Sequence, residues 1–341
     1  MSADPRIEPL KVRPGARFSC TLDGLCCSDI HAIGPLDEQD CDLISAISED
    51  AIEKHHADNE PVLLMRKDTG TCVFLSEQGC LLHAKLGSEF KPTPCRRFPF
   101  GLTATPEGGR INTRHRCSCR TLGARPELTV DSSRSSLVDR EGRVRADHAV
   151  GDILWSADRK LSFTEYEALE SELLHTLVAG THLREALGTA PFPKLQKQSW
   201  TDVATTLTSY EGDSAVEIAA AWVGDAIMAL VERGSKADRK RPWAGSFERA
   251  RERVVEPEHP NLIFGDWFAD ELWSLRWTQW GSLTRARSEW ATRLALVRKI
   301  TAWLMEEGHR EDLAAAEAVT IVDIVTHSDA WDSVQEEIPD A

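Results

Sequence analysis

The nine cysteines of this chain are confined to its first 120 residues, and residues 121–341 contain none. Eight of them fall in two stretches, CTLDGLCC at positions 20–27 and the run from Gly70 to Arg120, while Cys41 stands apart. Thiols gathered this densely are more typical of a metal-binding unit than of unrelated core positions. The confinement of the cysteines to the first 120 residues therefore predicts a cysteine-rich metal-binding domain, followed by a region that contains no cysteine.

The sequence indicates a compartment in which thiols stay reduced. The opening residues, MSADPRIEPLKVRPG, lack the apolar run of a signal peptide, and no stretch approaches the roughly 20 apolar residues that span a bilayer. We therefore expect a cytoplasmic protein without a membrane partner, in which clustered cysteines bind metal rather than form disulfides. The odd number of cysteines also disfavours a closed disulfide framework.

The net charge of −15 argues against a nucleic-acid partner, because neutralising phosphates requires a basic face. Residues 91–125 are an exception, with eight Lys or Arg and a single acidic residue, Glu107. This basic segment overlaps the cysteine-rich run, where positive charge would lower thiol pKa values and offset the charge of thiolates. A solvated basic loop is an equally good interpretation of the same residues.

Thiolate sulfur is a soft ligand that suits zinc and iron–sulfur clusters. The spacings do not show the C-x2-C pairs of a zinc ribbon, and eight thiols suffice for one four-ligand centre with spares or for two centres. Asp23 and His83 offer additional oxygen and nitrogen ligands. Cys41 lies among acidic neighbours, which raise a thiol pKa, so we assign it a structural role. The predicted metal ligands are Cys20, Cys26, Cys27, Cys72, Cys80, Cys95, Cys117 and Cys119.

Four separated motifs resemble, in order, those of the YkgJ-type cysteine-cluster family, a zinc- or iron-chelating domain with a C-x2-C-x2-C-C signature. The family includes relatives of flagellin lysine-N-methylase. The matching residues are Phe18 with CTLDGLCC, GTCVFL at 70–75, Gly79-Cys80, PTPCRRFPF at 92–100, and Cys117 and Cys119 at the place of the last family cysteine. The resemblance covers roughly residues 18–120, and Asp23 stands where the family has its second cysteine.

The resemblance implies a metal-binding protein that holds an iron–sulfur cluster, or zinc or iron, through its cysteines. It also implies an alternative function, cluster-dependent methylation of a protein lysine with S-adenosylmethionine, in which Arg96 and Arg97 would bind the carboxylate of the cofactor. The chain lacks the glycine-rich loop of a Rossmann-like methyltransferase, so that cofactor would have to bind at an open iron position. No hydrolase motif is present, and the sequence assigns no catalytic residue.

Residue patterning predicts the α+β class. We expect a cysteine-cluster domain at 1–125 with short strands and a hairpin turning at 106–109, a linker with short strands at 126–160, and a mainly helical domain at 161–341. The helical domain would recognise a protein substrate or partner, or cover the cysteine domain.

Apolar spacing also locates individual helices in the C-terminal half. A capping box from Thr164 to Glu167 predicts one helix start. Trp273, Trp277 and Trp280 would share one buried helical face. The further predicted helices are 201–209, 214–233, 245–254, 265–280, 283–307 and 310–326.

Overall fold

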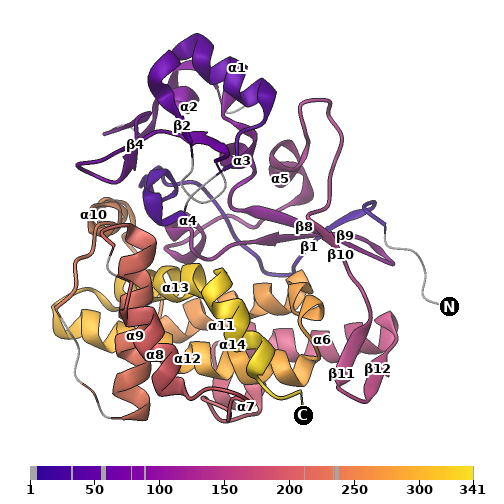
Figure 1. Ribbon diagram of the computed structural model, residues 1–341. Coiled ribbons are helices and arrows are strands. Elements are labelled where there is room, and N and C mark those ends of the chain that lie inside the picture. Colours follow the sequence, from indigo (N-terminus) through magenta and orange to yellow (C-terminus); the bar gives the residue numbers. More distant parts are fainter. Residues whose placement is uncertain are drawn as a thin grey trace.

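The computed structural model describes residues 6–31, 34–54, 59–77, 79–87, 90–210, 212–232, 234 and 238–340. The chain is an α+β protein, which confirms the predicted class. In Figure 1 the short strands and small helices of the N-terminal part, in indigo and purple, lie above the long orange and yellow helices of the C-terminal part. Within the residues described, none of the helices is long and apolar enough to cross a membrane.

A four-stranded sheet packs against the helices of the C-terminal part. Its strands are β1 (Leu10–Val12), β8 (Phe100–Thr105), β9 (Gly108–Thr113) and β10 (His148–Ala149), in the order β1-β9-β8-β10. β8 and β9 form the predicted hairpin, with an antiparallel register from Phe100↔Thr113 to Thr105↔Gly108, and the two outer strands pair in parallel. Every residue of β8 and β9 is buried, so this hairpin lies inside the molecule.

The hairpin turn requires a glycine at position 108. Its φ of 120° lies in the region that residues with side chains avoid, and a Cβ there would lie 2.1 Å from the carbonyl oxygen of Pro9. The missing side chain therefore lets the chain before β1 approach the hairpin closely enough to pair with β9.

The cysteine-rich stretch folds into many short elements that surround a small core. Leu36, Ile44, Leu63 and Phe74 are buried in this core, and several cysteines pack against it. The elements are η1 (Leu25–Cys27), η2 (Asp29–His31), α1 (Glu38–Ile47), η3 (Glu49–Ala51), β2 (Ile52–Lys54), β3 (Pro61–Leu63), β4 (Met65–Arg66), β5 (Thr71–Cys72), β6 (Leu75–Ser76), β7 (Gly79–Cys80), α2 (Leu81–Leu86), α3 (Thr93–Arg97) and α4 (Ser118–Thr121).

Residues 126–160 contain more regular structure than a linker suggests. The helix α5 (Val130–Leu137) begins with a capping box between Thr129 and Ser132, and β10 joins the main sheet. β11 (Ile153–Ser156) and β12 (Arg159–Leu161) then form a separate hairpin before the first long helix. The division into domains at residues 125 and 160 remains a prediction.

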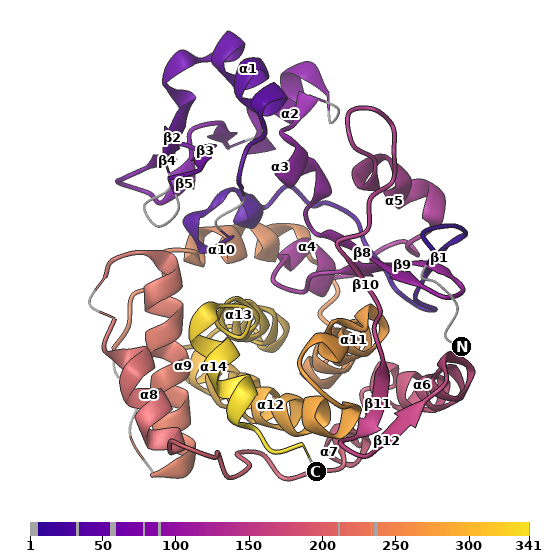
Figure 2. The same ribbon diagram turned by 45° about the vertical axis from the view of Figure 1, so that its right-hand side comes forward.

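The C-terminal part is organised around α13 (Glu311–Val325). Residues 312–325 are all buried, and four alanines among them let neighbouring helices approach closely. Figure 2 looks nearly along α13 and shows α9, α11 and α12 around it, in agreement with their contacts. The remaining elements are α6 (Phe163–Val178), α7 (Leu183–Leu187), α8 (Trp200–Thr208), α9 (Ala215–Val231), α10 (Ala244–Arg253), α11 (Pro260–Ser274), η5 (Arg276–Gln279), α12 (Leu283–Glu306) and α14 (Asp329–Glu337).

Two helix predictions need correction. The helix predicted over 265–280 ends at Ser274, because Leu275 adopts a left-handed conformation with φ of 56°. Trp273 and Trp277 are buried as predicted and Trp280 is half-buried, but the three lie on α11, on η5 and just after η5, not on one helix face. The capping box before α6 joins Ser162 to Glu165, so this helix begins earlier than the Thr164 motif indicates.

A buried charge network joins the N-terminal part to α11. Asp270 accepts hydrogen bonds from Arg13 Nε (2.5 Å), Thr113 Oγ1 (2.5 Å) and Arg120 Nη2 (3.0 Å), and its Oδ2 lies 2.9 Å from His115 Nε2. Arg13 and Arg120 also form ion pairs with Asp266, one helical turn earlier. Two carboxylates on α11 therefore bind side chains from α4, from β9 and from the residue that follows β1, and so hold these three segments against one helix.

Replacing Asp270 by asparagine removes the negative charge that the buried guanidinium groups of Arg13 and Arg120 share. We expect the free energy of unfolding to fall by about 3–5 kcal/mol, measured by denaturant unfolding followed by circular dichroism. The control is Asp152→Asn, which removes the exposed Lys160–Asp152 pair (2.6 Å) and should change stability little. A loss no larger than that of the control would contradict this role for Asp270.

The same network makes stability depend on pH. Burial by itself would raise the pKa of the Asp270 carboxyl group, but Arg13 and Arg120 hold it well below its ordinary value. A carboxyl group of this kind stabilises the folded state above its unfolded pKa of about 3.9, and the contribution is lost as the pH falls. The stability difference between wild type and Asp270→Asn should therefore shrink below about pH 4, whereas a difference independent of pH would contradict the assignment.

Candidate metal centre

Cysteines from separate segments of the N-terminal part lie within hydrogen-bonding or electrostatic range of one another. All nine are free thiols, and the eight predicted ligands lie on short elements or in the loops between them. Short elements joined by turns allow distant segments to meet without a continuous sheet. The segments are the loop before η1 (Cys20), η1 (Cys26, Cys27), β5 (Cys72), β7 (Cys80), α3 (Cys95) and the start of α4 (Cys117, Cys119).

Cys119 holds one thiolate position. Hydrogen bonds from Cys117, and next from Cys20, lower the pKa of Cys119 well below its usual value. The same bonds raise the pKa of both Cys117 and Cys20. The backbone N–H of Thr21 adds a further donor at 3.2 Å from the Cys119 sulfur. We call Cys20, Cys117 and Cys119 the Cys119 group, in which neighbouring thiols stabilise one thiolate.

Cys80 holds a second thiolate position. A hydrogen bond from Cys27 lowers the pKa of Cys80 to about 5, although burial opposes the shift. Hydrogen bonds to Cys26 and then to Cys80 raise the pKa of Cys27. Burial raises the pKa of Cys72 to about 11 and also raises that of Cys95, and both lie within electrostatic range of Cys80. We call Cys27, Cys72, Cys80 and Cys95 the Cys80 group.

Cys26 connects the two groups. It lies within electrostatic range of Cys20 and Cys117 in the Cys119 group. It also lies within range of Cys72 and Cys95 in the Cys80 group. The eight predicted ligands therefore belong to one continuous region of the molecule.

Lys91 places a positive charge in this region, and the sequence analysis did not identify it. Burial would lower the pKa of its ammonium group, but the surrounding thiols, Cys26 and Cys95 before the others, raise it. A charged ammonium at this place offsets part of the negative charge that clustered thiolates would carry. The only sequence signal was its position four residues before Cys95 in a basic segment.

The sulfurs are not gathered around one point. In the part of the chain described, only one group of three or more metal-ligating side chains has all its ligand atoms within 4.8 Å of one another, and it contains no cysteine. Among the described residues, Cys27, Cys72, Cys80 and Cys95 therefore do not lie close enough together to share a single ion as they stand. Three thiolates on one tetrahedral zinc would lie about 3.8 Å apart, given Zn–S bonds of about 2.3 Å. The observed spacing is wider.

Asp23 contacts the Cys119 group instead of taking the place of a thiolate within it. Its carboxylate accepts hydrogen bonds from Ser118 Oγ (2.8 Å) and the Leu25 N–H (3.0 Å) and lies 3.2 Å from the Cys119 sulfur. Burial, and next the charge of Cys119, raise the pKa of Asp23 to about 7. Asp23 is thus placed to orient Cys119 and Ser118.

The other predicted side chains lie in different surroundings. His83 is exposed on α2. The pKa of Cys41 is raised by burial and by its acidic neighbours Asp40, Asp37 and Asp42, as the sequence analysis expected.

Arg96 and Arg97 bind the segment that follows α5. Arg96 donates to the carbonyl of Val138 (3.2 Å), and Arg97 donates to the carbonyls of Leu137 (3.2 Å) and Arg145 (2.8 Å) and pairs with Asp147 (3.0 Å). These bonds use most of the donors of Arg97. A role of the two arginines in binding a cofactor carboxylate stays a prediction.

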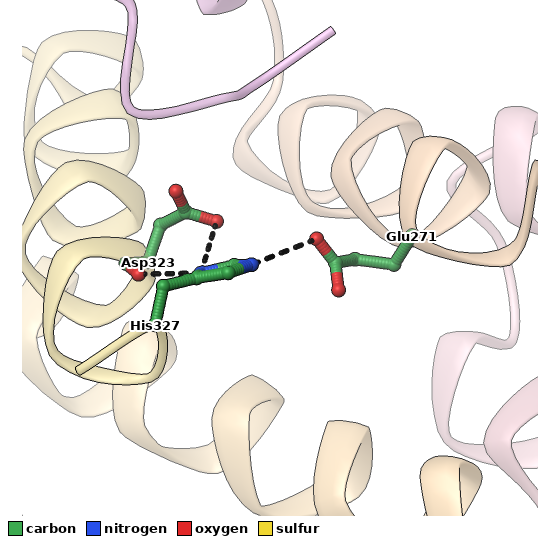
Figure 3. A group of neighbouring side chains, drawn as sticks. All are labelled: Glu271, Asp323 and His327. Carbon is green, nitrogen blue, oxygen red and sulfur yellow. Dashed lines mark hydrogen bonds and ion pairs between the residues drawn. The ribbon is translucent and has the colours of Figure 1, made fainter. Parts of the chain in front are cut away.

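A second group of ionisable side chains lies in the helical part (Figure 3). His327 Nδ1 lies 2.8 Å from the Asp323 carbonyl oxygen and 3.6 Å from Asp323 Oδ1, and its Nε2 lies 4.0 Å from Glu271 Oε1. Trp267 Nε1 donates to Asp323 (3.0 Å), and Arg293 donates to Glu271 (3.2 Å). The spacing of Asp323 and His327, four residues apart at a helix end, was the signal that the sequence analysis missed.

Comparison of the chain with known proteins identified no related protein. No protein-family model matches the chain, and no curated protein and no solved structure matches it either. The resemblance to the YkgJ-type family therefore stays a prediction that rests on the four motifs.

Thiol alkylation distinguishes the eight predicted ligands from Cys41. Cys20 is exposed, so excess reagent at alkaline pH should alkylate it in metal-free protein even though its raised pKa slows the reaction, whereas a metal bound to the eight cysteines should protect Cys20 because its sulfur becomes a ligand. Cys41 should react to the same extent in both forms. Mass spectrometry of alkylated peptides measures this, and equal labelling of Cys20 with and without metal would remove it from the ligand set.

Proposed function

We propose that this chain is a metalloprotein whose clustered cysteines hold an iron–sulfur cluster. The observation that supports the proposal most directly is the gathering of eight thiols from distant segments around two thiolate positions, Cys80 and Cys119. Thiolate is the form in which cysteine binds metal, and most cysteines lose their proton only above neutral pH. Two thiolates stabilised by neighbouring thiols therefore amount to a site prepared for a soft cation.

The spacing of the sulfurs favours a cluster over a single ion. A polynuclear cluster attaches its cysteines to different irons, so its ligands lie farther apart than those of one zinc ion. The described cysteines show this wider distribution, since no three of them come mutually within 4.8 Å. Zinc or iron bound by fewer thiols is the alternative, and it would need the sulfurs to move together on binding.

The surroundings also fit a thiolate-rich centre. Lys91 provides a positive charge within range of Cys26, Cys80, Cys95 and Cys20, which compensates for the negative charge of a cluster with cysteine ligands. When bound, a cluster of this type supplies one-electron chemistry, or it cross-links the chain segments that carry its cysteine ligands. The residues around it hold the thiols in place: Thr21 and Asp23 contact Cys119, and backbone N–H groups of Leu82 and His83 support Cys80.

The proposed role is a structural or redox-sensing centre. Methylation of a protein lysine with S-adenosylmethionine remains the alternative that the family resemblance implies. It would require a firmly held cluster with one open position, and a cofactor-binding test separates the two functions. Purified, reconstituted protein that binds S-adenosylmethionine in calorimetry would support the enzyme, and protein that does not would support the structural or sensing role.

The metal and its ligands can be tested together by anaerobic purification, metal and sulfide analysis and an absorption spectrum. We expect iron with acid-labile sulfide, and we expect Cys72→Ser, Cys80→Ser and Cys95→Ser each to lose most of it because each removes a thiolate ligand. Cys41→Ser is the matched control and should retain the wild-type content.

Two results would contradict these assignments. Colourless protein with stoichiometric zinc would overturn the iron–sulfur cluster while keeping a metal centre. Equal loss of metal in all four variants, Cys41→Ser included, would overturn the ligand set.

A further inference from the structure

A histidine and two carboxylates from two helices of the C-terminal part lie around one point (Figure 3). Asp323 and His327 stand four residues apart at the end of α13, so their side chains lie on the same side of that turn. Glu271 lies on α11, which packs against α13. One ligand atom from each of the three side chains lies within 4.8 Å of the others. Atoms that share one ion lie at most about 4.2 Å apart when each bond is about 2.1 Å long, so small shifts would let all three bind one ion.

The backbone of α13 determines which ring nitrogen of His327 faces Glu271. Nδ1 lies 2.8 Å from the carbonyl oxygen of Asp323, so Nδ1 carries the proton and donates it to this oxygen. The other nitrogen, Nε2, faces Glu271 Oε1 at 4.0 Å, which is too long for a hydrogen bond. Two metal–ligand bonds of about 2.1 Å each span such a separation. A ring N–H donated to a backbone carbonyl is also the arrangement that orients metal-binding histidines in proteins.

Each carboxylate is held through one oxygen and leaves its other oxygen without a donor. Arg293 Nη1 donates to Glu271 Oε2 at 3.2 Å, and Trp267 Nε1 donates to Asp323 Oδ1 at 3.0 Å. Within the described ranges, no hydrogen bond reaches Glu271 Oε1 or Asp323 Oδ2. Donors that bind one oxygen and orient the other are the usual outer layer of a carboxylate ligand. Both carboxylates are therefore positioned, and each has an oxygen available for an ion.

The charge at bonding distance also favours a cation. Among the residues that the structure describes, Arg293 is the one Lys or Arg side chain within 4.0 Å of these two carboxylates. Glu289 shares it, accepting from its Nε at 3.0 Å and from its Nη2 at 2.7 Å. Arg116 and Arg276 lie farther away and only weaken the negative field at longer range. The two carboxylates therefore keep negative charge that an ion bonded directly to them would neutralise.

We propose that Glu271, Asp323 and His327 bind a divalent transition-metal ion such as Mn²⁺ or Zn²⁺. One imidazole nitrogen with two carboxylate oxygens is a ligand set that suits such ions, whereas it does not suit the softer ions that thiolates select. The His327 side chain is 14% exposed and that of Glu271 19%, so solvent reaches the ion. Three protein ligands then leave further coordination positions for water or another ligand, as in open metal sites. This site uses none of the cysteines and is a second centre beyond the one proposed above.

Titration of the purified full-length protein with Mn²⁺, followed by electron paramagnetic resonance, tests the proposal. Mn²⁺ prefers oxygen and nitrogen ligands and does not compete for the cysteines. We expect one Mn²⁺ per chain, and we expect Glu271→Gln and His327→Gln each to weaken binding roughly tenfold or more because each alters one ligand. Glu271→Gln keeps an oxygen that accepts from Arg293. The matched control is Glu185→Gln, which breaks the exposed His182–Glu185 pair (2.9 Å) and should bind Mn²⁺ as wild type does.

Measurements on the unmutated protein keep the test decisive if a variant does not fold. Mn²⁺ should raise the Tm of wild type, because a ligand of the folded state stabilises it, and should broaden the NMR signals of the His327 ring before those of exposed His182. No saturable binding, unchanged binding in both variants, or broadening confined to other histidines would overturn the proposal. Mn²⁺ binding that Cys80→Ser abolishes would also overturn it. Iron and sulfide contents of the same samples report separately on the cysteine centre, so failure of one site is distinguishable from failure of the other.

Discussion

Two carboxylates on α11, Asp266 and Asp270, carry the contact between the two parts of this protein. Arg13 and Arg120 reach them from the two ends of the N-terminal part, and both guanidinium groups are buried. Buried ion pairs cost desolvation free energy and are therefore worth more for defining geometry than for net stability. Here they fix the position of α4, and Cys119 immediately precedes Arg120. The thiol region is thereby oriented by a helix that contributes no cysteine.

In the metal centre that we propose, the thiols would be held near one another before the metal binds. Hydrogen bonds between a thiol and a thiolate replace part of what a cation would provide, and Lys91 supplies a permanent positive charge. The proposed ligands are thus kept near one another without full convergence, and in the proposed metal centre the remaining approach would be coupled to metal binding. Backbone and hydroxyl donors around Cys119 and Cys80 act as the outer layer that orients metal ligands in such sites.

Residue type and local periodicity made part of this structure predictable. Cysteine reveals its chemistry directly, so the thiol region could be located, and apolar spacing gave most C-terminal helices to within a few residues. The break at Leu275 could not be foreseen, because leucine has no preference for a left-handed conformation. The partners of Asp270 lie 150 residues away or more, and the arginines around His327 come from distant segments. Contacts between residues so far apart in the sequence depend on the topology of the fold, which a single sequence does not reveal.

The small core around Leu36, Ile44 and Phe74 has a consequence for motion. The Cys80 group packs against this core, whereas the Cys119 group is fastened to the helical part: Arg120 binds Asp270, and Arg249 donates to the Asp23 carbonyl at 2.7 Å. The two groups are thus held mainly by different contacts, and the small core could open without unfolding the long helices, since local stability follows local packing. Opening of the small core would draw one set of sulfurs away from the other while every long helix stayed folded. A bound cofactor with ligands from both groups would then hold the small core against the helical part.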